Sequence, residues 1–142
     1  MSLESLCRRE IVCVNRSTMV IDATKMMEEK NVGSVVVIDM DRPLGILTDR
    51  DVMIRLVNNG LDAEKTPVSD VMSREIITLN QKTGLYEALE QIKDSKSSVR
   101  RFPIVDDNGS IKGIITLDDV IYLLGKEMSD VSAIIESERP RL

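Results

Sequence analysis

The feature that most constrains this chain is an internal repeat with a period near half its length. Residues 45–52 (Gly-Ile-Leu-Thr-Asp-Arg-Asp-Val) return as residues 113–120 (Gly-Ile-Ile-Thr-Leu-Asp-Asp-Val), with five of eight positions identical and an offset of 68 residues. Residues 9–14 match residues 74–79 at an offset of 65, and the three extra residues of the second copy fall in expected loops. Because repetition marks the structural unit, we expect two copies of one fold rather than a single irregular domain.

Composition limits what these two copies can do. With 142 residues, 42% of them hydrophobic, the chain can form one compact domain or two halves that share a core. It has no Trp, one Phe and two Tyr, and a net charge of −5, so it offers few stacking platforms and no overall positive charge for nucleic acid. The longest unbroken apolar run, residues 35–38, is too short to span a bilayer, and we expect a soluble, cytoplasmic protein without membrane contact.

Catalysis and metal binding are also poorly provided for. The sequence has no histidine and two cysteines, so the usual general base and the usual zinc ligands are missing. Carboxylates such as Asp118 and Asp119 remain, without a second buried acid to pair with. We therefore expect no enzyme, no catalytic residue, no metal site and no required cofactor.

Each copy is predicted to run strand, helix, strand, strand, helix. A β-rich segment at residues 76–79 precedes Leu85, Ala88, Leu89 and Ile92, whose spacing is that of one helix face. The first copy has Val20, Ala23, Met26 and Met27 in the same role. Apolar runs then lead through turn-forming residues into returning strands, and a second helical stripe follows in each copy: Val52, Leu56 and Val57, and Val120, Leu123 and Leu124.

These elements give expected boundaries. The first repeat should cover residues 6–60, a connector with a short helix residues 61–72, and the second repeat residues 73–125. Gly60 and Gly125 are expected to end the last helix of each repeat. Residues 1–3 could be a cloning remnant, and no role in the fold is expected of them.

The remaining segment, residues 126–142, is predicted to form a C-terminal helix and tail. Leu124, Met128, Val131 and the pair Ile134 and Ile135 lie at near-helical spacing. This helix could pack on the second chain of a dimer or cap the chain's own core, and the sequence does not favour either.

A β-α-β-β-α repeat that closes with Gly-Ile-x-Thr-x-x-Asp-Val, preceded in one copy by Val71-Met72-Ser73-Arg74, resembles a CBS domain. Two in tandem resemble a Bateman module, over about residues 6 to 125. The resemblance implies a mixed α/β (α+β) fold in which two repeats pack with pseudo-two-fold symmetry and leave two clefts between them. It also implies a disc-shaped homodimer and, as regulatory ligand, an adenine nucleotide (AMP, ADP or ATP) or S-adenosylmethionine.

The Thr-x-x-Asp segments at Thr48–Asp51 and Thr116–Asp119 are the first candidate ligand contacts. A threonine where a strand becomes a helix lies at a natural phosphate position, and an aspartate three residues later can accept two ribose hydroxyls. The same pattern is a helix capping box, which is the better explanation in an arbitrary protein. Within a CBS-like repeat we assign Thr48 and Thr116 to phosphate or ribose and Asp51 and Asp119 to the ribose diol.

Two further pairs follow from the same resemblance. Thr18 and Thr83 precede the first helix of each repeat, where the matching threonine of CBS nucleotide sites contacts the ligand; the alternative is a helix N-cap. Ala23 and Ala88, five residues later, could be small so that a flat base can approach, or could simply be good helix formers.

The strongest difference between the copies lies just before the second strand of each repeat. The second copy has Arg100 and Arg101 where the first has Gly33 and Ser34. Guanidinium groups suit bidentate phosphate contact, and we assign all four residues to ligand clefts, with Arg101 as the best phosphate ligand. The alternative is solvation, or pairing of the arginines with Asp106 or Asp107. The two clefts should therefore be unequal, although Arg50 could compensate in the cleft without the arginine pair.

The function that these expectations favour is a stand-alone sensor of an adenosyl ligand that acts through a homodimer or an unidentified effector protein. A ligand-free structural dimerisation scaffold is the alternative. Two intact Thr-x-x-Asp segments argue against empty clefts.

Overall fold

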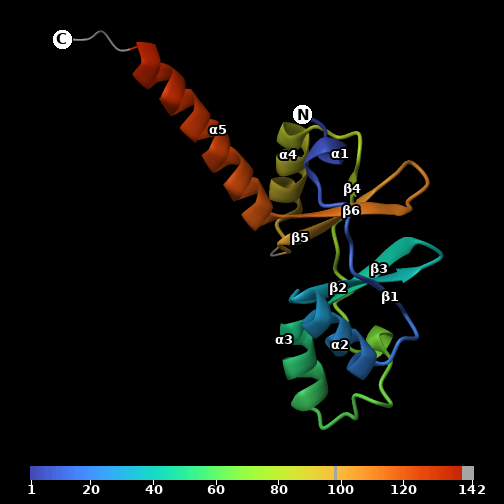
Figure 1. Ribbon diagram of the computed structural model, residues 1–142. Coiled ribbons are helices and arrows are strands. Elements are labelled where there is room, and N and C mark those ends of the chain that lie inside the picture. Colours follow the sequence, from blue (N-terminus) through green and yellow to red (C-terminus); the bar gives the residue numbers. More distant parts are fainter. Residues whose placement is uncertain (98, 139–142) are drawn as a thin grey trace.

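The chain folds into two halves, each built on a three-stranded sheet (Figure 1). The computed structural model describes residues 1–97 and 99–138. In each sheet the central strand pairs parallel to the first strand and antiparallel to the third. The first sheet contains β1 (Cys13–Asn15), β2 (Ser34–Asp39) and β3 (Arg42–Thr48), and the second contains β4 (Leu79–Asn80), β5 (Arg101–Val105) and β6 (Ile111–Thr116).

The helices complete the order that the sequence predicts, because each half runs strand, helix, strand, strand, helix. The parallel strand pair of each half is joined by one helix, and a second helix follows the third strand. Two short helices precede the halves. In chain order the helices are α1 (Leu3–Leu6), α2 (Val20–Lys30), α3 (Asp49–Asp51) with the π-helix Val52–Val57, the 3-10 helix Val68–Asp70, α4 (Leu85–Ser95) and α5 (Leu117–Glu138).

The predicted helix faces are the faces that the structure buries. Val20, Ala23 and Met27 of α2 lie in one core, with Met26 packed at its edge. Ala88 of α4 is buried in a second core, and the remaining predicted apolar residues of α4 pack against that core. The periodicity argument was therefore correct for both helices.

Each half has its own cluster of buried side chains, rather than one core shared by both. The segment that precedes each half packs into the other half. Leu3 of α1 is fully buried with Phe102 and Ile104 in the second core, and Val68 of the connector is fully buried in the first. Figure 1 shows α1 beside α4. Our exclusion of residues 1–3 from the fold was wrong, because the Leu3 side chain is part of the second core.

Gly45 and Gly113 leave room for the segments that cross from one half to the other. A Cβ at Gly45 would lie 2.6 Å from the Ser73 carbonyl oxygen, and one at Gly113 would lie 2.9 Å from the Arg8 carbonyl oxygen and closer still to the Cys7 sulfur. The neighbouring residues form β-bridges across these contacts, Ile46 with Ser73 and Ile114 with Arg8. The glycine of each Gly-Ile-x-Thr segment is thus required by a strand-like segment that lies directly against it.

The last helix differs from the expectation. Gly125 does not end it, because α5 continues from Leu117 to Glu138 without a break and projects from the body (Figure 1). The part of α5 beyond Gly125 does not cap the chain's own core either, since Met128, Val131 and Ile135 are 55–71% exposed. Residues 139–142 of the expected tail lie outside the described residues. Across the two described ranges, no helix has the length and apolar content needed to cross a bilayer.

Candidate functional site

A cleft of about 440 Å³ lies where the two halves meet, at the end of β3 and the start of β5. We call it the arginine cleft. It takes residues from the first repeat and from the second repeat, as the resemblance implies for a ligand cleft. Its lining comprises Ile46, Thr48, Asp49, Arg50, Asp51, Arg55, Ser73, Arg74, Glu75, Val99, Arg100 and Arg101.

Five arginines face three carboxylates in this cleft, which leaves an excess of two positive charges in a chain that is acidic overall. Some of these arginines are engaged: Arg55 donates to the Met72 carbonyl at 2.7 Å, and Arg74 donates to the Ser69 carbonyl at 3.0 Å. The guanidinium groups of Arg50 and Arg101 make no hydrogen bond or ion pair with the described residues. Arg101 is also partly buried, so its charge is less screened by solvent than an exposed one.

The first Thr-x-x-Asp segment forms a capping box at the edge of the arginine cleft. The Asp51 backbone N–H donates to the Thr48 hydroxyl at 3.1 Å, and the Thr48 backbone N–H donates to Asp51 Oδ2 at 3.0 Å. The other carboxylate oxygen, Oδ1, accepts a hydrogen bond from the Ser73 hydroxyl at 3.0 Å. The capping alternative is therefore correct for Thr48 and Asp51 in this structure. Their contact with a ligand stays a prediction, and both line the cleft.

The second Thr-x-x-Asp segment forms the same box but has a different third partner. The Asp119 backbone N–H donates to the Thr116 hydroxyl at 3.0 Å, and the Thr116 backbone N–H donates to Asp119 Oδ2 at 3.0 Å. Asp119 Oδ1 is paired with the guanidinium of Arg8. Thr116 and Asp119 do not line the arginine cleft.

The structure brings the predicted small and basic residues together at one end of the sheets. Ser34 pairs with Thr48 across β2 and β3, and Arg101 pairs with Thr116 across β5 and β6. A Cβ at Gly33 would lie 3.8 Å from the Arg101 guanidinium. The expected difference between the two clefts as anion sites stays a prediction. One detail was wrong, because Arg50 lies in the same cleft as Arg100 and Arg101, where the α3 turn that follows β3 places it, and so cannot compensate in the other.

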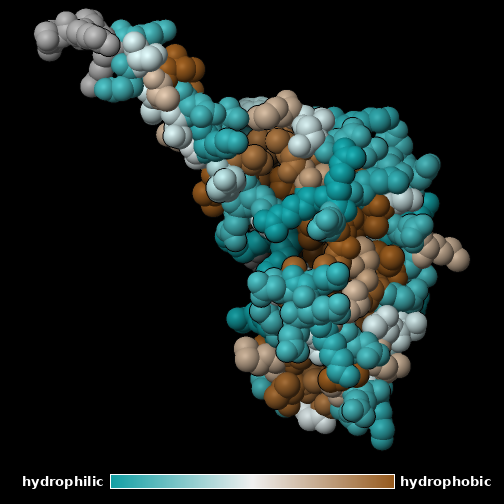
Figure 2. All heavy atoms as spheres, viewed as in Figure 1, coloured by the Kyte–Doolittle hydropathy of each residue, from teal (hydrophilic) through white to brown (hydrophobic). Residues whose placement is uncertain are grey.

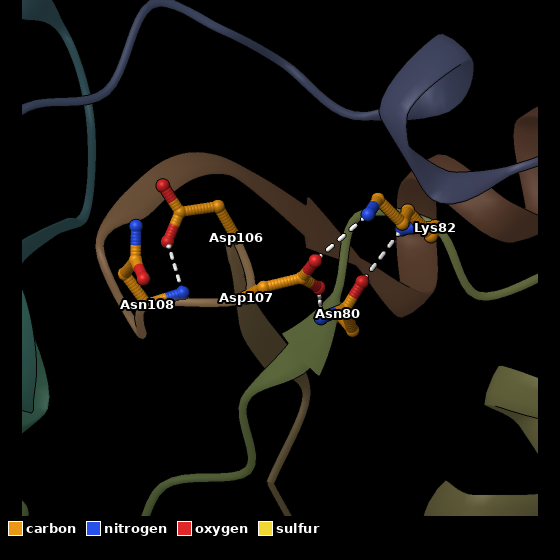
Figure 3. A network of polar contacts seen from close by, with 5 residues as sticks. All are labelled: Asn80, Lys82, Asp106, Asp107 and Asn108. Carbon is orange, nitrogen blue, oxygen red and sulfur yellow. Dashed lines mark hydrogen bonds and ion pairs between the residues drawn. The ribbon is translucent and has the colours of Figure 1, made fainter.

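The expected alternative partners of the arginines are engaged elsewhere. Figure 3 shows Asp107 bonded to Lys82 and Asn80, and Asp106 bonded to the Asn108 backbone in the β5–β6 turn. The hydrogen bond from Lys82, with that from Asn80, lowers the pKa of Asp107, and the hydrogen bond to Asp107 raises the pKa of Lys82. Arg100 instead lies 3.4 Å from Asp118, where both side chains are more than half exposed and the pair is weak.

Four of the residues considered as ligand contacts do not line the arginine cleft: Thr18, Thr83, Ala23 and Ala88. Thr18 and Thr83 are not N-caps, since Met19 and Gly84 hold those positions without a side-chain cap. Their backbone carbonyls instead accept hydrogen bonds from Val68 and Leu3 at 2.8 and 2.9 Å. Neither threonine lines the arginine cleft.

Ala23 and Ala88 are core residues. Their exposed fractions are 0% and 1%, and they belong to the first and second core respectively. Both are absent from the lining of the arginine cleft. Small size at these positions serves helix packing in this structure.

The prediction missed three residues at the start of the second repeat that line the arginine cleft: Ser73, Arg74 and Glu75. The signal was present, because Arg74 and Glu75 repeat Arg9 and Glu10 at the offset of 65 residues. A recurring charged pair outside the strands and helices of the repeat could have marked them as cleft residues.

A second cavity, of about 800 Å³, lies beside the N-terminal segment 8–10, which corresponds to residues 73–75 in the second repeat. Arg8, Arg9 and Glu10 line it with Lys30 and Val32 among others. Within the described ranges, no group of three or more Cys, His, Asp or Glu side chains is arranged to hold a metal ion. Burial raises the pKa of the thiols of Cys7 and Cys13, and therefore disfavours the reactive thiolate.

The family model of the CBS domain matches this chain twice, at residues 3–58 and 68–126. The chain belongs to the CBS domain family. The two matches coincide with the two halves of the structure and include the buried Leu3 and the buried Val68. The protein is thus a CBS pair, a regulatory type of module.

Known CBS proteins agree with this assignment. The CBS domain-containing protein YhcV of Bacillus subtilis is 33% identical over 132 residues, which cover 93% of this chain and 89% of YhcV. An uncharacterised protein of Methanopyrus kandleri is 32% identical, with 86% of this chain matched to only 62% of that protein. A conserved CBS domain protein of unknown function from Thermoplasma acidophilum has a similar structure, with a TM-score of 0.73, 27% identity, and coverage of 86% of this chain and 68% of the other.

Proposed function

We propose that this CBS pair is a regulatory sensor that binds a phosphate-bearing adenine nucleotide in the arginine cleft. The observation that carries the proposal is the position of Arg101. Its partly buried guanidinium has no partner among the described residues and lines the same cleft as Thr48 and Asp51. A cationic group able to bind phosphate thus lies near a carboxylate able to bind a ribose diol.

The charge of the cleft favours AMP, ADP or ATP over S-adenosylmethionine. Five arginines outnumber three carboxylates in the lining. A sulfonium centre carries a positive charge and would be repelled where phosphate groups would be attracted. The volume of about 440 Å³ lies within the usual range for small-molecule sites, roughly 300 to 1,000 Å³.

We infer binding rather than catalysis at this site. The three carboxylates of the lining all accept hydrogen bonds. Asp51 accepts from Thr48 and Ser73, Asp49 from the Arg50 backbone N–H, and Glu75 from the Ser97 hydroxyl. The sequence also contains no histidine that could replace them. A cytoplasmic location fits a nucleotide sensor whose two cysteines are free thiols.

The sensor would act through a homodimer or a separate effector protein. The projecting part of α5 supports a protein contact, because its apolar side chains lie exposed among hydrophilic ones (Figure 2). An empty dimerisation scaffold would share this helix. A ligand that binds only the folded protein raises its melting temperature, whereas an empty scaffold does not respond.

The test is titration calorimetry with AMP, ADP, ATP and S-adenosylmethionine, on the natural chain and on Arg101→Ala. We expect at least one phosphate-bearing nucleotide to bind more tightly than S-adenosylmethionine. Arg101→Ala should weaken that binding about tenfold to a hundredfold, since a charge-assisted hydrogen bond is lost. The matched control is Arg42→Ala, which removes an exposed arginine from the β2–β3 hairpin. Equal affinities of all three proteins would contradict the proposal.

A further inference from the structure

Arg8 and Ser73 occupy equivalent positions in the two halves of the molecule. Each lies just before the first strand of a repeat and pairs with the third strand of the other repeat, Arg8 with Ile114 and Ser73 with Ile46. Both bridges have two backbone hydrogen bonds of 2.9 and 3.0 Å. The two side chains therefore start from the same place relative to their Thr-x-x-Asp segments.

From these equivalent positions the two side chains make chemically different contacts with Asp51 and Asp119. In both capping boxes Oδ2 accepts the threonine N–H, so Oδ1 is the oxygen left for a ligand. Ser73 donates a hydroxyl hydrogen to Asp51 Oδ1, and Arg8 places a guanidinium on Asp119 Oδ1. A serine hydroxyl is small, neutral and able to rotate, so a ribose hydroxyl can share or replace its bond. A guanidinium is larger and keeps its charge when displaced.

The arginine cleft and the second cavity also differ in whether the neighbouring Thr-x-x-Asp segment lines them. Thr48 and Asp51 line the arginine cleft. The cavity of the second side is lined by Arg8 itself and its neighbours, and Thr116 and Asp119 are not part of its wall. Among the described residues, the Arg8 side chain thus lies between the second Thr-x-x-Asp segment and the open space beside it.

We propose that Arg8 is an internal occupant of the second ribose site. This inference rests on the proposed function. The arginine cleft binds one adenine nucleotide per chain, and Thr116 and Asp119 form a latent second site for the same class of ligand that Arg8 keeps closed. The asymmetry of the two clefts then has two causes: Arg101 strengthens one, and Arg8 blocks the other.

The test counts sites by titration calorimetry with ADP on the natural chain and on Arg8→Ser, which copies the residue of the first half. We expect one site in the natural chain and a second saturable site in Arg8→Ser. Arg8→Lys keeps a positive charge near Asp119 and should retain one site. Arg9→Ser removes an equally exposed arginine of the same segment that makes no bond to Asp119, and should also retain one.

Asp119→Ala identifies the new site. In the natural chain it should leave stoichiometry and affinity unchanged, and in the Arg8→Ser background it should return the count to one. Two sites in the natural chain, or no additional site in Arg8→Ser relative to the natural chain, would overturn the inference. No site in the natural chain together with one in Arg8→Ser would instead refute the proposed role of the arginine cleft and support that of Arg8. Circular dichroism of each variant checks that the fold is retained.

Discussion

Gly45 and Gly113 illustrate at the residue scale how the repeat sequence encodes a contact between the two halves. Each lacks a side chain where a segment from outside its own sheet passes at backbone distance. The sequence reveals that these glycines recur, but it does not reveal what approaches them, because Ser73 and Arg8 lie far from them in the chain. The structure supplies the reason for the recurring glycine.

Gly45→Ala tests this contact. The new Cβ would meet the Ser73 carbonyl oxygen at 2.6 Å and the Met72 sulfur at 2.8 Å, so the connector must shift away from β3. We expect the free energy of unfolding, measured with urea, to fall by about 1 to 3 kcal/mol, the usual cost of overpacking. Gly125→Ala is the control, because its Cβ enters open space on a helix and should not lower stability. Equal effects of the two substitutions would contradict this account.

The capping boxes show where residue-level prediction stops. The spacing of Thr48 and Asp51 is compatible with a helix cap and with a nucleotide contact, and the structure shows the cap. The two roles are not exclusive, since the cap uses Oδ2 and leaves Oδ1 pointed at Ser73. Sequence spacing fixes the box itself, whereas the third partner comes from a distant segment.

At the scale of elements, the spacing of apolar residues predicted α2 and α4 correctly, because each helix presents one apolar face to one core. It was a poorer guide to the last helix of each repeat. After α3 the chain forms a π-helix, whose wider turn leaves Val57 62% exposed although it belonged to the predicted stripe. Gly125 was expected to end a helix, but this glycine lies in the helix interior with open space around it.

The exposed side of α5 has the spacing of a coiled-coil seam. Its apolar residues recur at alternating intervals of four and three, a period that matches a second helix rather than a flat surface. Of the four positions that flank this seam (125, 127, 132 and 134), only Glu127 is charged, so little charge repulsion opposes a second copy of α5. The part of α5 beyond Gly125 has 13 residues, a marginal length for an isolated helix in water, roughly 12 to 15 residues. The seam residues are Ile121, Leu124, Met128, Val131 and Ile135.

We expect two chains to pair through this seam. Val131→Asp places a charge at its centre and should raise the dimer dissociation constant at least about tenfold, measured by analytical ultracentrifugation, because an unpaired charge is costly in an apolar interface. Ser129→Asp adds the same charge on the outward side of the helix and should leave the constant unchanged. A natural chain that is monomeric, or a dimer that tolerates Val131→Asp, would show that α5 does not hold two copies together.

At the scale of the whole molecule, the sequence predicted the two repeats and their internal order, because local pattern and repetition determine both. The inference that Arg100 and Arg101 make one cleft the better anion site stays a prediction. The sequence could not predict which residues meet in each cleft, since that depends on the exchange of Leu3 and Val68 between the halves. The positions of Ser73 and Arg8 follow from this exchange.

The most direct test of the central claim is a crystal structure of the protein grown with ADP. We predict the phosphates beside the Arg101 guanidinium and the ribose hydroxyls on Asp51, with Arg8 still paired to Asp119. A nucleotide bound on Thr116 and Asp119 instead, or on a surface outside the arginine cleft, would contradict the account.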